Sequence, residues 1–188
     1  LLVQDGSQLA TLYKNKSVAE QNSVDVAWRL LMGSEFEKLR ECIYADEAEL
    51  LHFRQVLVNV VMATDIMDKE LNGMRRARWE TAFSSDNVEL STSSLQTKDD
   101  RVNRKATIVI EHLVVASDVA HTMQHWHVYA KWNEKLFHEM LLAYKKGRLD
   151  KDPVEGWYEG EKGFFDFYII PLAKKLGTCG VFGVSSHE

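Results

Sequence analysis

The residues with the clearest chemical potential lie in one short stretch, ASDVAHTMQHWHVYAKW, at positions 116–132. Asp118 ends an apolar run there, and His121, His125 and His127 follow it. On a continuous helix Asp118, His121 and His125 would share one face, because residues three or four positions apart are neighbours. Carboxylate oxygens and imidazole nitrogens suit a divalent metal ion. The spacing therefore allows a metal site, and the alternative is a helix whose histidines are ordinary, partly exposed polar residues.

Two other stretches set polar groups against apolar ones. In VVMATDIMDKE, Thr64 and Asp65 interrupt an apolar helix face, and a buried carboxylate is costly unless it has a partner. These residues predict either a helix-end cap or one wall of a polar pocket. In NKSVAEQNS, Glu20 stands three residues after Ser17, which is the spacing of a capping box. Local chemistry alone therefore assigns Glu20 to the first turn of a helix.

A third stretch, WYEGEKGFFDFYIIPLAKKL, is dense in aromatic residues. One interpretation is a core helix that is entered through a glycine-rich loop. The other is an aromatic slot for a flat ligand, in which Glu161 is the polar anchor and Gly163 permits close approach. The sequence contains no glycine-rich phosphate loop, no G-x-S-x-G elbow and no H-E-x-x-H motif, which excludes the enzyme classes that depend on them.

The chain that must position these residues has 188 residues, of which 45% are hydrophobic and 27% charged, with a net charge of −5. This composition predicts a soluble globular protein with a single domain over residues 1–188. Interspersed charges argue against nucleic acid and against direct membrane contact. Cys42 and Cys179 are lone cysteines, which favours a reducing compartment. No apolar run reaches the roughly 20 residues of a membrane span, so we expect a cytoplasmic domain, although its parent protein can be anchored elsewhere.

Apolar positions recur at helical spacing, and the chain has only 10 Gly and 2 Pro, so the sequence predicts an all-α fold, a multi-helix bundle. The polar, Ser/Thr-rich residues 84–100 are expected to form a loop. The predicted helices are Val18–Met32, Glu47 to about Met67, Arg75–Phe83, about Arg101 to Asp118, about Gln124 to Lys146 with Gly147 as its C-cap, and Phe164–Leu176. The inward residues expected on the fourth helix are Val102, Ala106, Val109, Ile110, Leu113 and Ala116. The stripe expected on the fifth helix is Trp126, Tyr129, Trp132, Leu136, Met140 and Tyr144.

Five segments follow one another along the chain: LATLYKNKSVAEQNSVDVAWRLL, VNVVMATDIMDKE, ASDVAH, YAKWNEKLF and EKGFFDFYIIPL. In this order and spacing they resemble the catalytic domain of class I cyclic nucleotide phosphodiesterases, an all-helical family that cleaves cAMP or cGMP. The first is similar to the segment after the family's second histidine–aspartate metal motif, and the second to its ATD helix. ASDVAH resembles the A-D-L-S-N-P stretch that supplies a metal ligand. The last two resemble the Y-x-x-W helix and the Q-x-G-F-x-D-x-x-x-x-P-L segment that holds the purine.

The resemblance implies a role for each candidate residue. It makes Asp118 a metal ligand, whereas His125 and His127 match no family ligand, so the helical Asp-His-His triad is set aside. It assigns Glu20 and Thr64 to metal-bound water and places Leu136 and Phe164 on either side of the base. The substrate-binding residues that it implies are Ile66, His121, Tyr129, Trp132, Leu136, Glu161 and Phe164.

The implied mechanism uses Zn²⁺ and Mg²⁺ (or Mn²⁺), which hold a hydroxide that attacks phosphorus in line. The family's other ligands and its general acid lie in motifs that we expect upstream of Leu1. The resemblance therefore predicts the C-terminal portion of a hydrolase that acts on a cyclic nucleotide in signal transduction, in a parent protein with room for regulatory or membrane domains. One alternative is a regulatory helical module that binds a nucleotide without hydrolysis. A generic helical interaction domain is another.

Glu161 departs from the family pattern, which has Gln at this position. An ionised Glu only accepts hydrogen bonds, and guanine presents two adjacent donors, so the sequence favours cGMP over cAMP. Two alternatives stay open. Glu161 can pair with Lys162 or another cation, or burial can keep it protonated so that it behaves like Gln.

Overall fold

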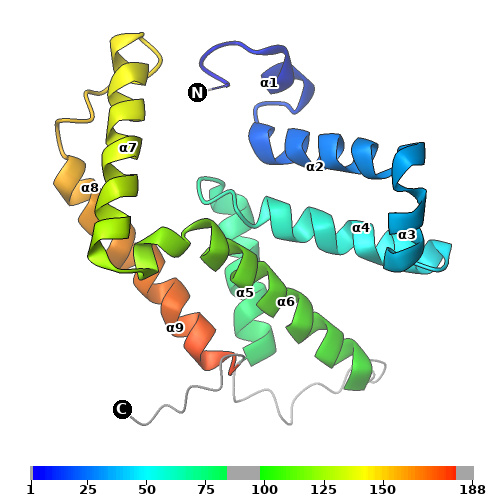
Figure 1. Cartoon of the computed structure of the whole chain (residues 1–188). Coiled ribbons are helices and arrows are strands. Elements are labelled where there is room, and N and C mark those ends of the chain that lie inside the picture. Colours follow the sequence, from blue (N-terminus) through cyan, green and yellow to red (C-terminus); the bar gives the residue numbers. More distant parts are fainter. Residues whose placement is uncertain (1, 84–97, 181–188) are drawn as a thin grey trace. The chain divides into compact units, whose positions relative to one another are not determined.

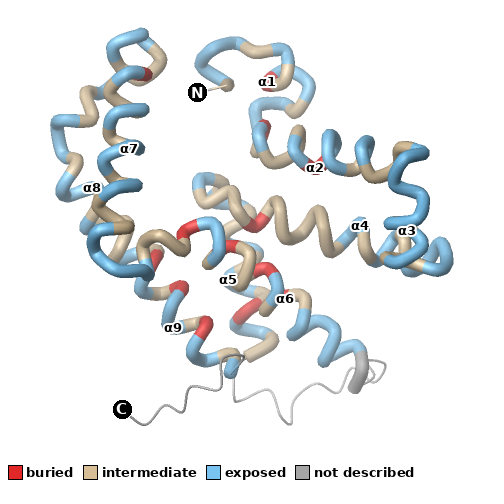
Figure 2. The backbone as a smooth tube through the Cα atoms, viewed as in Figure 1, coloured by how far each residue is buried: buried red, intermediate tan, exposed pale blue. Residues whose placement is uncertain are grey.

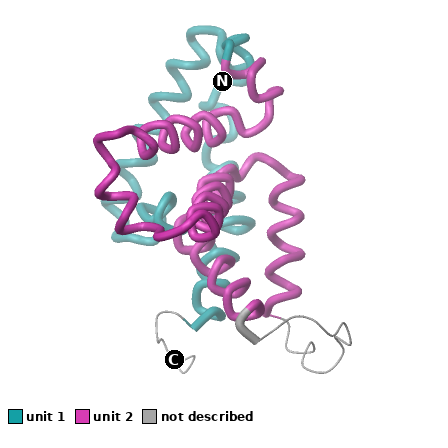
Figure 3. Tube along the Cα trace, turned by 90° about the vertical axis from the view of Figure 1, so that its right-hand side faces the viewer, with its two compact units in different colours: residues 1–8, 116–188 teal, residues 9–115 magenta. Residues whose placement is uncertain are grey.

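The computed structural model describes residues 2–83 and 98–180, and every regular element in these ranges is helical (Figure 1). The all-α prediction is therefore confirmed. Contact density divides the chain into two compact units (Figure 3): unit 1 comprises Leu1–Gln8 and Ala116–Glu188, and unit 2 comprises Leu9–Val115. The expectation of a single domain stays a prediction. Among the described residues, no helix combines the length and apolar character that a membrane crossing requires.

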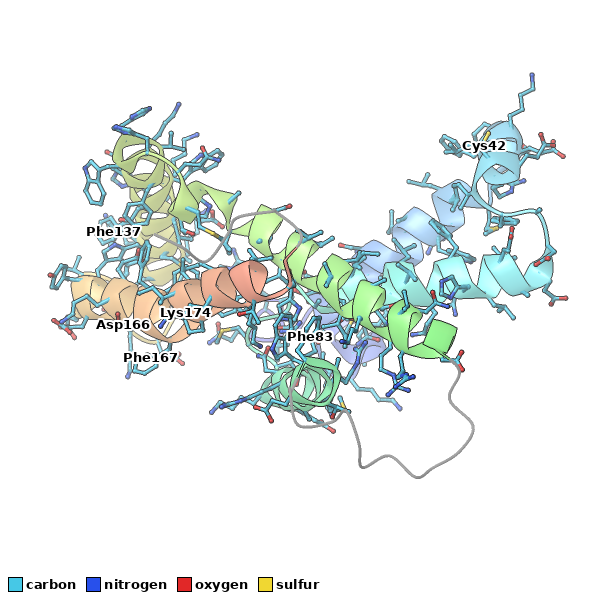
Figure 4. All side chains as sticks on the ribbon, turned by 90° about the horizontal axis from the view of Figure 1, so that it is seen from below. Cys42, Phe83, Phe137, Asp166, Phe167 and Lys174 are labelled. Carbon is cyan, nitrogen blue, oxygen red and sulfur yellow. The ribbon has the colours of Figure 1, made fainter. Side chains whose placement is uncertain are left out.

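In unit 2, α2 (Val18–Leu31) packs along α4 (Glu47–Met62) (Figure 1). Helix α4 begins where the Asp46 carboxylate accepts a hydrogen bond from the backbone N–H of Glu49, at 2.9 Å, so one of the free donors of the first turn is satisfied. Between the two helices lie η1 (Ser34–Phe36) and α3 (Glu37–Ile43), which carries the exposed Cys42 (Figure 4). The helix α1 (Gln8–Leu12) precedes them.

The predicted capping box at the start of α2 is wrong. Ser17 has a left-handed backbone with φ of 40°, its side chain makes no cap hydrogen bond, and its hydroxyl is buried without a partner in the described structure. The chain enters α2 through a tight turn in which Lys14 and Asn15 also have positive φ. Because the Ser17 hydroxyl makes no bond to the first turn of α2, Glu20 has no capping partner in Ser17.

The helix predicted from Glu47 to about Met67 ends at Met62, because the next residues form a turn. The Asp65 carboxylate accepts hydrogen bonds from the backbone N–H groups of Met67 (2.9 Å) and Asp68 (3.2 Å). Asp68 in turn accepts from Glu70 and Leu71. Asp65 therefore stabilises the turn between α4 and α5 (Lys69–Phe83), and Asp68 is the residue that accepts from the first turn of α5. A place for Asp65 in the wall of a polar pocket stays a prediction.

Helices α5 and α6 (Lys98–Asp118) are joined by side-chain contacts from several turns. The inward face predicted for α6 is wrong: Val102 is 56% exposed and Ile110 41% exposed. The buried residues of this helix are instead Ile108, Glu111 and Val115. The face is rotated because Glu111, a charged residue that hydropathy places outside, is buried with a cationic partner on α5. The predicted loop falls largely on residues 84–97, outside the described residues, and its last residues open α6.

In unit 1, η3 (Ala120–Met123) leads to α7 (Trp126–Lys145), which ends at Gly147 with φ of +70°, the left-handed conformation expected of a C-cap glycine. The final helical segment begins earlier than predicted. It consists of α8 (Trp157–Phe164), the π-helical turn η4 (Phe165–Ile169) and α9 (Ile170–Thr178). Its buried residues are Ile169, Leu172 and Leu176, and Figure 2 shows buried positions in red along α9.

Candidate functional site

A chain of side-chain hydrogen bonds joins α7 to α8 within unit 1. The indole N–H of Trp157 donates to Asn133 Oδ1 at 3.2 Å, and Asn133 Nδ2 donates to the Tyr129 hydroxyl oxygen at 3.2 Å. The Tyr129 hydroxyl then donates to Glu161 Oε2. We call these four residues the relay. It brings together Tyr129 and Glu161, two residues that the sequence assigned to substrate binding.

Aromatic rings hold the relay in place. The Phe137 ring packs edge-on against Trp157 at 5.0 Å, and the Phe165 ring packs edge-on against Tyr129 at 5.3 Å. Beside the relay is an open cleft of about 350 Å³. Its lining residues are Trp126, Tyr129, Ala130, Asn133, Glu134, Phe137 and Trp157. A cleft with mostly aromatic walls and a few polar groups suits a flat, polar ligand.

The electrostatics of the relay keep the Tyr129 proton on the phenol. Burial of the hydroxyl, together with its hydrogen bond to the Glu161 carboxylate, raises the pKa of Tyr129. Tyr129 is therefore a hydrogen-bond donor to Glu161 at neutral pH. Lys162 does not neutralise Glu161: its Nζ lies 3.3 Å from Glu159 Oε2 and 5.7 Å from the centre of the Tyr158 ring. The proposed pairing of Glu161 with Lys162 is thus not the arrangement found.

Two residues expected to enclose a base lie on these same helices. Leu136, on α7, is 48% exposed, and Phe164, the last residue of α8, stacks on Tyr168 with ring centres 5.4 Å apart. Their role as a clamp stays a prediction. Gly163 needs no close approach, because a Cβ there would meet only the Phe167 side chain, at 3.9 Å. Phe167 is 86% exposed and projects from the helix (Figure 4).

The histidine cluster does not form the metal site that its spacing allows. Helix α6 ends at the exposed Asp118, and the chain continues as a short 3-10 helix that contains His121 and then an extended residue, so Asp118, His121 and His125 share no continuous helix. The centres of the His121 and Trp132 rings lie 6.4 Å apart, and the Lys135 ammonium lies over the Trp132 ring, 4.6 Å from its centre. This brings together two more residues assigned to substrate.

The remaining candidates belong to unit 2. Glu20 is half-buried on α2. The Thr64 hydroxyl donates to the Val61 carbonyl at 2.8 Å. Ile66 is half-buried in the turn after α4, and its carbonyl accepts from Asn72 at 2.9 Å. The roles of these residues towards metal-bound water and substrate stay predictions.

The described residues do not by themselves fit a zinc or magnesium site. Over residues 2–83 and 98–180, no group of three or more His, Cys, Asp or Glu side chains is placed to hold a metal ion. A structural or catalytic zinc needs at least three protein ligands, and Asp118 offers one carboxylate. The metal chemistry implied by the resemblance therefore cannot be derived from these residues alone.

Two members of the relay, Asn133 and Trp157, are not marked as site residues by the sequence. Asn133 falls within the quoted stretch YAKWNEKLF, but nothing in its spacing marks it, because its donor Trp157 lies 24 positions further along the chain. Trp157 opens the aromatic stretch that was singled out. Its indole N–H, which is costly to bury without a partner, is the signal that could have prompted a search for an acceptor on another helix.

The amino-acid sequence matches the family described as 3'5'-cyclic nucleotide phosphodiesterase over residues 1–180. The chain is 25% identical over 180 residues to the 3',5'-cyclic-AMP phosphodiesterase 4C of Mus musculus, covering 91% of this chain and 25% of that protein. It is 22% identical over 187 residues to the dual specificity calcium/calmodulin-dependent 3',5'-cyclic nucleotide phosphodiesterase 1B of Rattus norvegicus, covering 93% of this chain and 30% of that protein.

The fold is similar to the phosphodiesterase domain of the rhodopsin phosphodiesterase from Salpingoeca rosetta. The TM-score is 0.66 at 19% sequence identity, over 95% of this chain and 53% of that chain. The chain thus spans a quarter to a third of the curated relatives and about half of the solved domain.

Proposed function

The chain belongs to the 3'5'-cyclic nucleotide phosphodiesterase family, and we propose that the protein containing it hydrolyses 3',5'-cyclic nucleotides to 5'-nucleotides. The observation that carries the proposal is the contact between Tyr129 and Glu161. The resemblance assigned both residues to substrate from separate motifs, and they lie 32 positions apart in the sequence. A coincidental likeness of short motifs gives no reason for the two side chains to meet.

Each residue of this chain has a defined part in the proposal. The relay and the rings around it bind and orient the base, with Leu136 and Phe164 on its two faces. His121 and Trp132 in unit 1, and Ile66 in unit 2, each keep the substrate-binding role that the resemblance implies. Asp118 is one ligand of the divalent metal ions that family membership implies, and Glu20 and Thr64 order water beside them.

The other metal ligands belong, in this proposal, to the part of a family catalytic domain that this chain does not span. The metal ions supply Lewis acidity and an activated water when they are bound. The contribution of residues 1–188 is to hold the nucleotide, to exclude water from the base and to present Asp118. We also propose a cytosolic setting, because Cys42 and Cys179 are free thiols, which a reducing compartment preserves.

The test is an assay of the longest natural protein that contains this chain, with cAMP and cGMP as separate substrates and Mg²⁺ present. We expect turnover of at least one nucleotide and its loss on chelation. Absence of turnover of both, in protein shown to be folded by circular dichroism, would contradict the proposal.

A second function is favoured by the incomplete metal site: nucleotide binding without hydrolysis. The 188-residue chain alone provides the relay but no described group of three metal ligands, and one carboxylate cannot retain zinc. We therefore expect the isolated chain to turn over neither nucleotide. The binding-only function is correct if the longest natural protein also binds a cyclic nucleotide and leaves it intact.

A further inference from the structure

We infer that one face of the helical segment formed by η4 and α9 is a contact surface between two copies of this chain, related by a two-fold axis at Ile170. The residues of this surface, which we call the α9 face, are Asp166, Phe167, Ile170, Ala173, Lys174 and Gly177. All of them lie in unit 1 and are exposed. The inference does not depend on the proposed function, because none of these residues has a part in it.

The α9 face carries apolar side chains that nothing in the described structure covers. Phe167 is 86% exposed, and Ile170, less than one turn further on, is 43% exposed. Phe167 is also the middle residue of the π-helical turn η4, and such departures from α-helical geometry are frequent at functional sites. Exposed apolar groups that gather on one helix, with polar groups beside them, favour contact with another protein surface.

Two opposite charges stand at equal distances from Ile170 on this face. Asp166 lies four residues before it and Lys174 four residues after it, on the segment shown in Figure 4. Within residues 2–83 and 98–180, neither side chain has an ion-pair partner. An antiparallel second copy, turned about an axis at Ile170, brings each Asp166 level with the partner's Lys174. Two equivalent ion pairs would then fix the register of the contact.

The same axis sets a large side chain against a small one. Phe167 lies three residues before Ile170 and Ala173 three residues after it, so each phenyl ring is level with the partner's Ala173. Gly163 and Gly177 lie seven residues on either side of Ile170. A Cβ at Gly177 would meet nothing within 4 Å, and one at Gly163 would meet only the Phe167 side chain, at 3.9 Å. The backbone is therefore open to close approach at both ends of the contact.

This arrangement points to a second copy as the occupant. In a two-fold contact the same patch serves both partners, so each residue must face its complement on that patch. A charge pair and a large–small pair that are both centred on Ile170 meet this requirement. A different protein as partner would give no reason for the centring. Because the face belongs to one helical segment, the contact is small, and we expect a dissociation constant of about 10–100 µM.

The experiment measures disulfide formation at the axis in the longest natural protein that contains this chain. Every native cysteine, including Cys42 and Cys179, is replaced by serine, and Ile170→Cys places one thiol of each copy at the axis. The protein is oxidised with copper phenanthroline at about 100 µM, near the expected dissociation constant. Leu142→Cys, on α7 and 57% exposed, is the matched control. We expect Ile170→Cys to form disulfide dimers at least about fivefold faster, since a disulfide needs Cβ atoms that lie close together.

Charge reversal tests the register with the same readout. With Ile170→Cys present, Asp166→Lys or Lys174→Asp sets like charges opposite each other, and each should slow crosslinking about tenfold. An equimolar mixture of the two variants should return to within about twofold of the unreversed rate, because every facing pair is then opposite in charge. Asp150→Lys, the same reversal at an exposed aspartate outside the face, should leave the rate unchanged. Circular dichroism checks that each variant is folded.

The outcomes are distinct for this inference and for the proposed function. Crosslinking at Ile170→Cys no faster than at Leu142→Cys overturns the inference, including the case in which another part of the natural protein covers the α9 face. Fast crosslinking that the charge reversals leave unchanged, or that their mixture fails to restore, overturns the two-fold register. Fast crosslinking with restoration in the mixture supports it. None of these results depends on hydrolysis of a nucleotide, so the proposed function is tested separately.

Discussion

Two carboxylates, one in each unit, are held in opposite ways. In unit 2 the Glu111 side chain is 3% exposed and faces the guanidinium of Arg78, with Nη2 3.1 Å from Oε1 and Nη1 3.3 Å from Oε2. In unit 1 Glu161 is half-buried, and its described partner is the neutral hydroxyl of Tyr129. Glu111 is therefore buried against a cation, whereas the described partner of the half-buried Glu161 carries no charge.

The difference separates a structural carboxylate from one that we propose binds the substrate. Glu111 accepts its hydrogen bond at Oε2 only, and Oε1 has no hydrogen-bond partner in the described structure although it lies within ion-pair distance of Arg78. Burial raises the pKa of Glu111, and the charge of Arg78 offsets only part of this effect. A group held in this way serves helix packing. Glu161 differs in that its described partner is the neutral Tyr129 hydroxyl.

Asp118 gives the largest test of this distinction, because it is an exposed carboxylate in unit 1 and the residue assigned to the metal. In the longest natural protein, we expect Asp118→Asn to lower kcat/KM by about a hundredfold or more, since even residues behind metal ligands cost ten- to a hundredfold when lost. Bound metal, measured by elemental analysis, should fall in parallel. Asp150→Asn, an exposed aspartate of the same unit, is the control. Equal activity of the two variants would place Asp118 among the surface charges.

Glu111 should matter to stability instead. Glu111→Ala leaves the half-buried Arg78 without its carboxylate, and we expect a loss of about 2 kcal/mol in the free energy of unfolding. Replacing both residues, with Glu111→Leu and Arg78→Met, should cost less than about 1 kcal/mol, because no charge is left unpaired. Urea titrations followed by circular dichroism measure both values.

The control for this pair is Glu80→Ala, which removes the exposed ion pair with Arg76 and should cost no more than about 0.5 kcal/mol. If Glu111→Ala lowers the free energy of unfolding as little as Glu80→Ala does, burial does not distinguish Glu111 from a surface carboxylate. The structural role assigned to Glu111 in the comparison with Glu161 would then be wrong.

The pH dependence of stability is a second test of the burial of Glu111, and the expected effect is smaller. Because burial raises the pKa of Glu111 above its ordinary value of 4.5, the folded state favours the protonated form. That contribution is fully present below the unfolded pKa and is lost as pH rises through the folded pKa. The stability of the wild type relative to Glu111→Gln should therefore fall as pH rises above the ordinary pKa of 4.5, by about 1.4 kcal/mol for each unit of pKa shift. A difference that stays constant or grows with pH would contradict this direction.

The sequence predicted what depends on local pattern. Helical periodicity placed α2 and α7 to within two residues of their observed ends, because an apolar stripe with few glycines and prolines favours a helix whatever it packs against. The resemblance drew attention to Tyr129 and Glu161 as substrate residues, and the structure joins them.

What the sequence could not predict depends on partners far along the chain. The face of α6 was misjudged because hydropathy gives no reason to place Glu111 inside, and its partner Arg78 lies 33 positions away in the sequence. Asn133 was missed for the same reason. The capping box at Ser17 failed because a left-handed backbone is a property of the whole turn, and two residues at the right spacing do not reveal it.

The smallest expected effect concerns two histidines that are close together but have no ligand role. His125 and His127 have Nδ1 atoms 2.7 Å apart at the start of α7, and both side chains are exposed. Their proximity alone could suggest a metal or proton-transfer pair, but the described residues add no third ligand. Two exposed side chains at a helix end also have little packing to fix their positions. We expect His125→Ala and His127→Ala each to change kcat/KM of the longest natural protein by less than about twofold, as surface substitutions usually do. A loss of metal and rate comparable to that of Asp118→Asn would show that exposed groups without a fixed partner can form a site in unit 1, and would restore the helical Asp-His-His hypothesis.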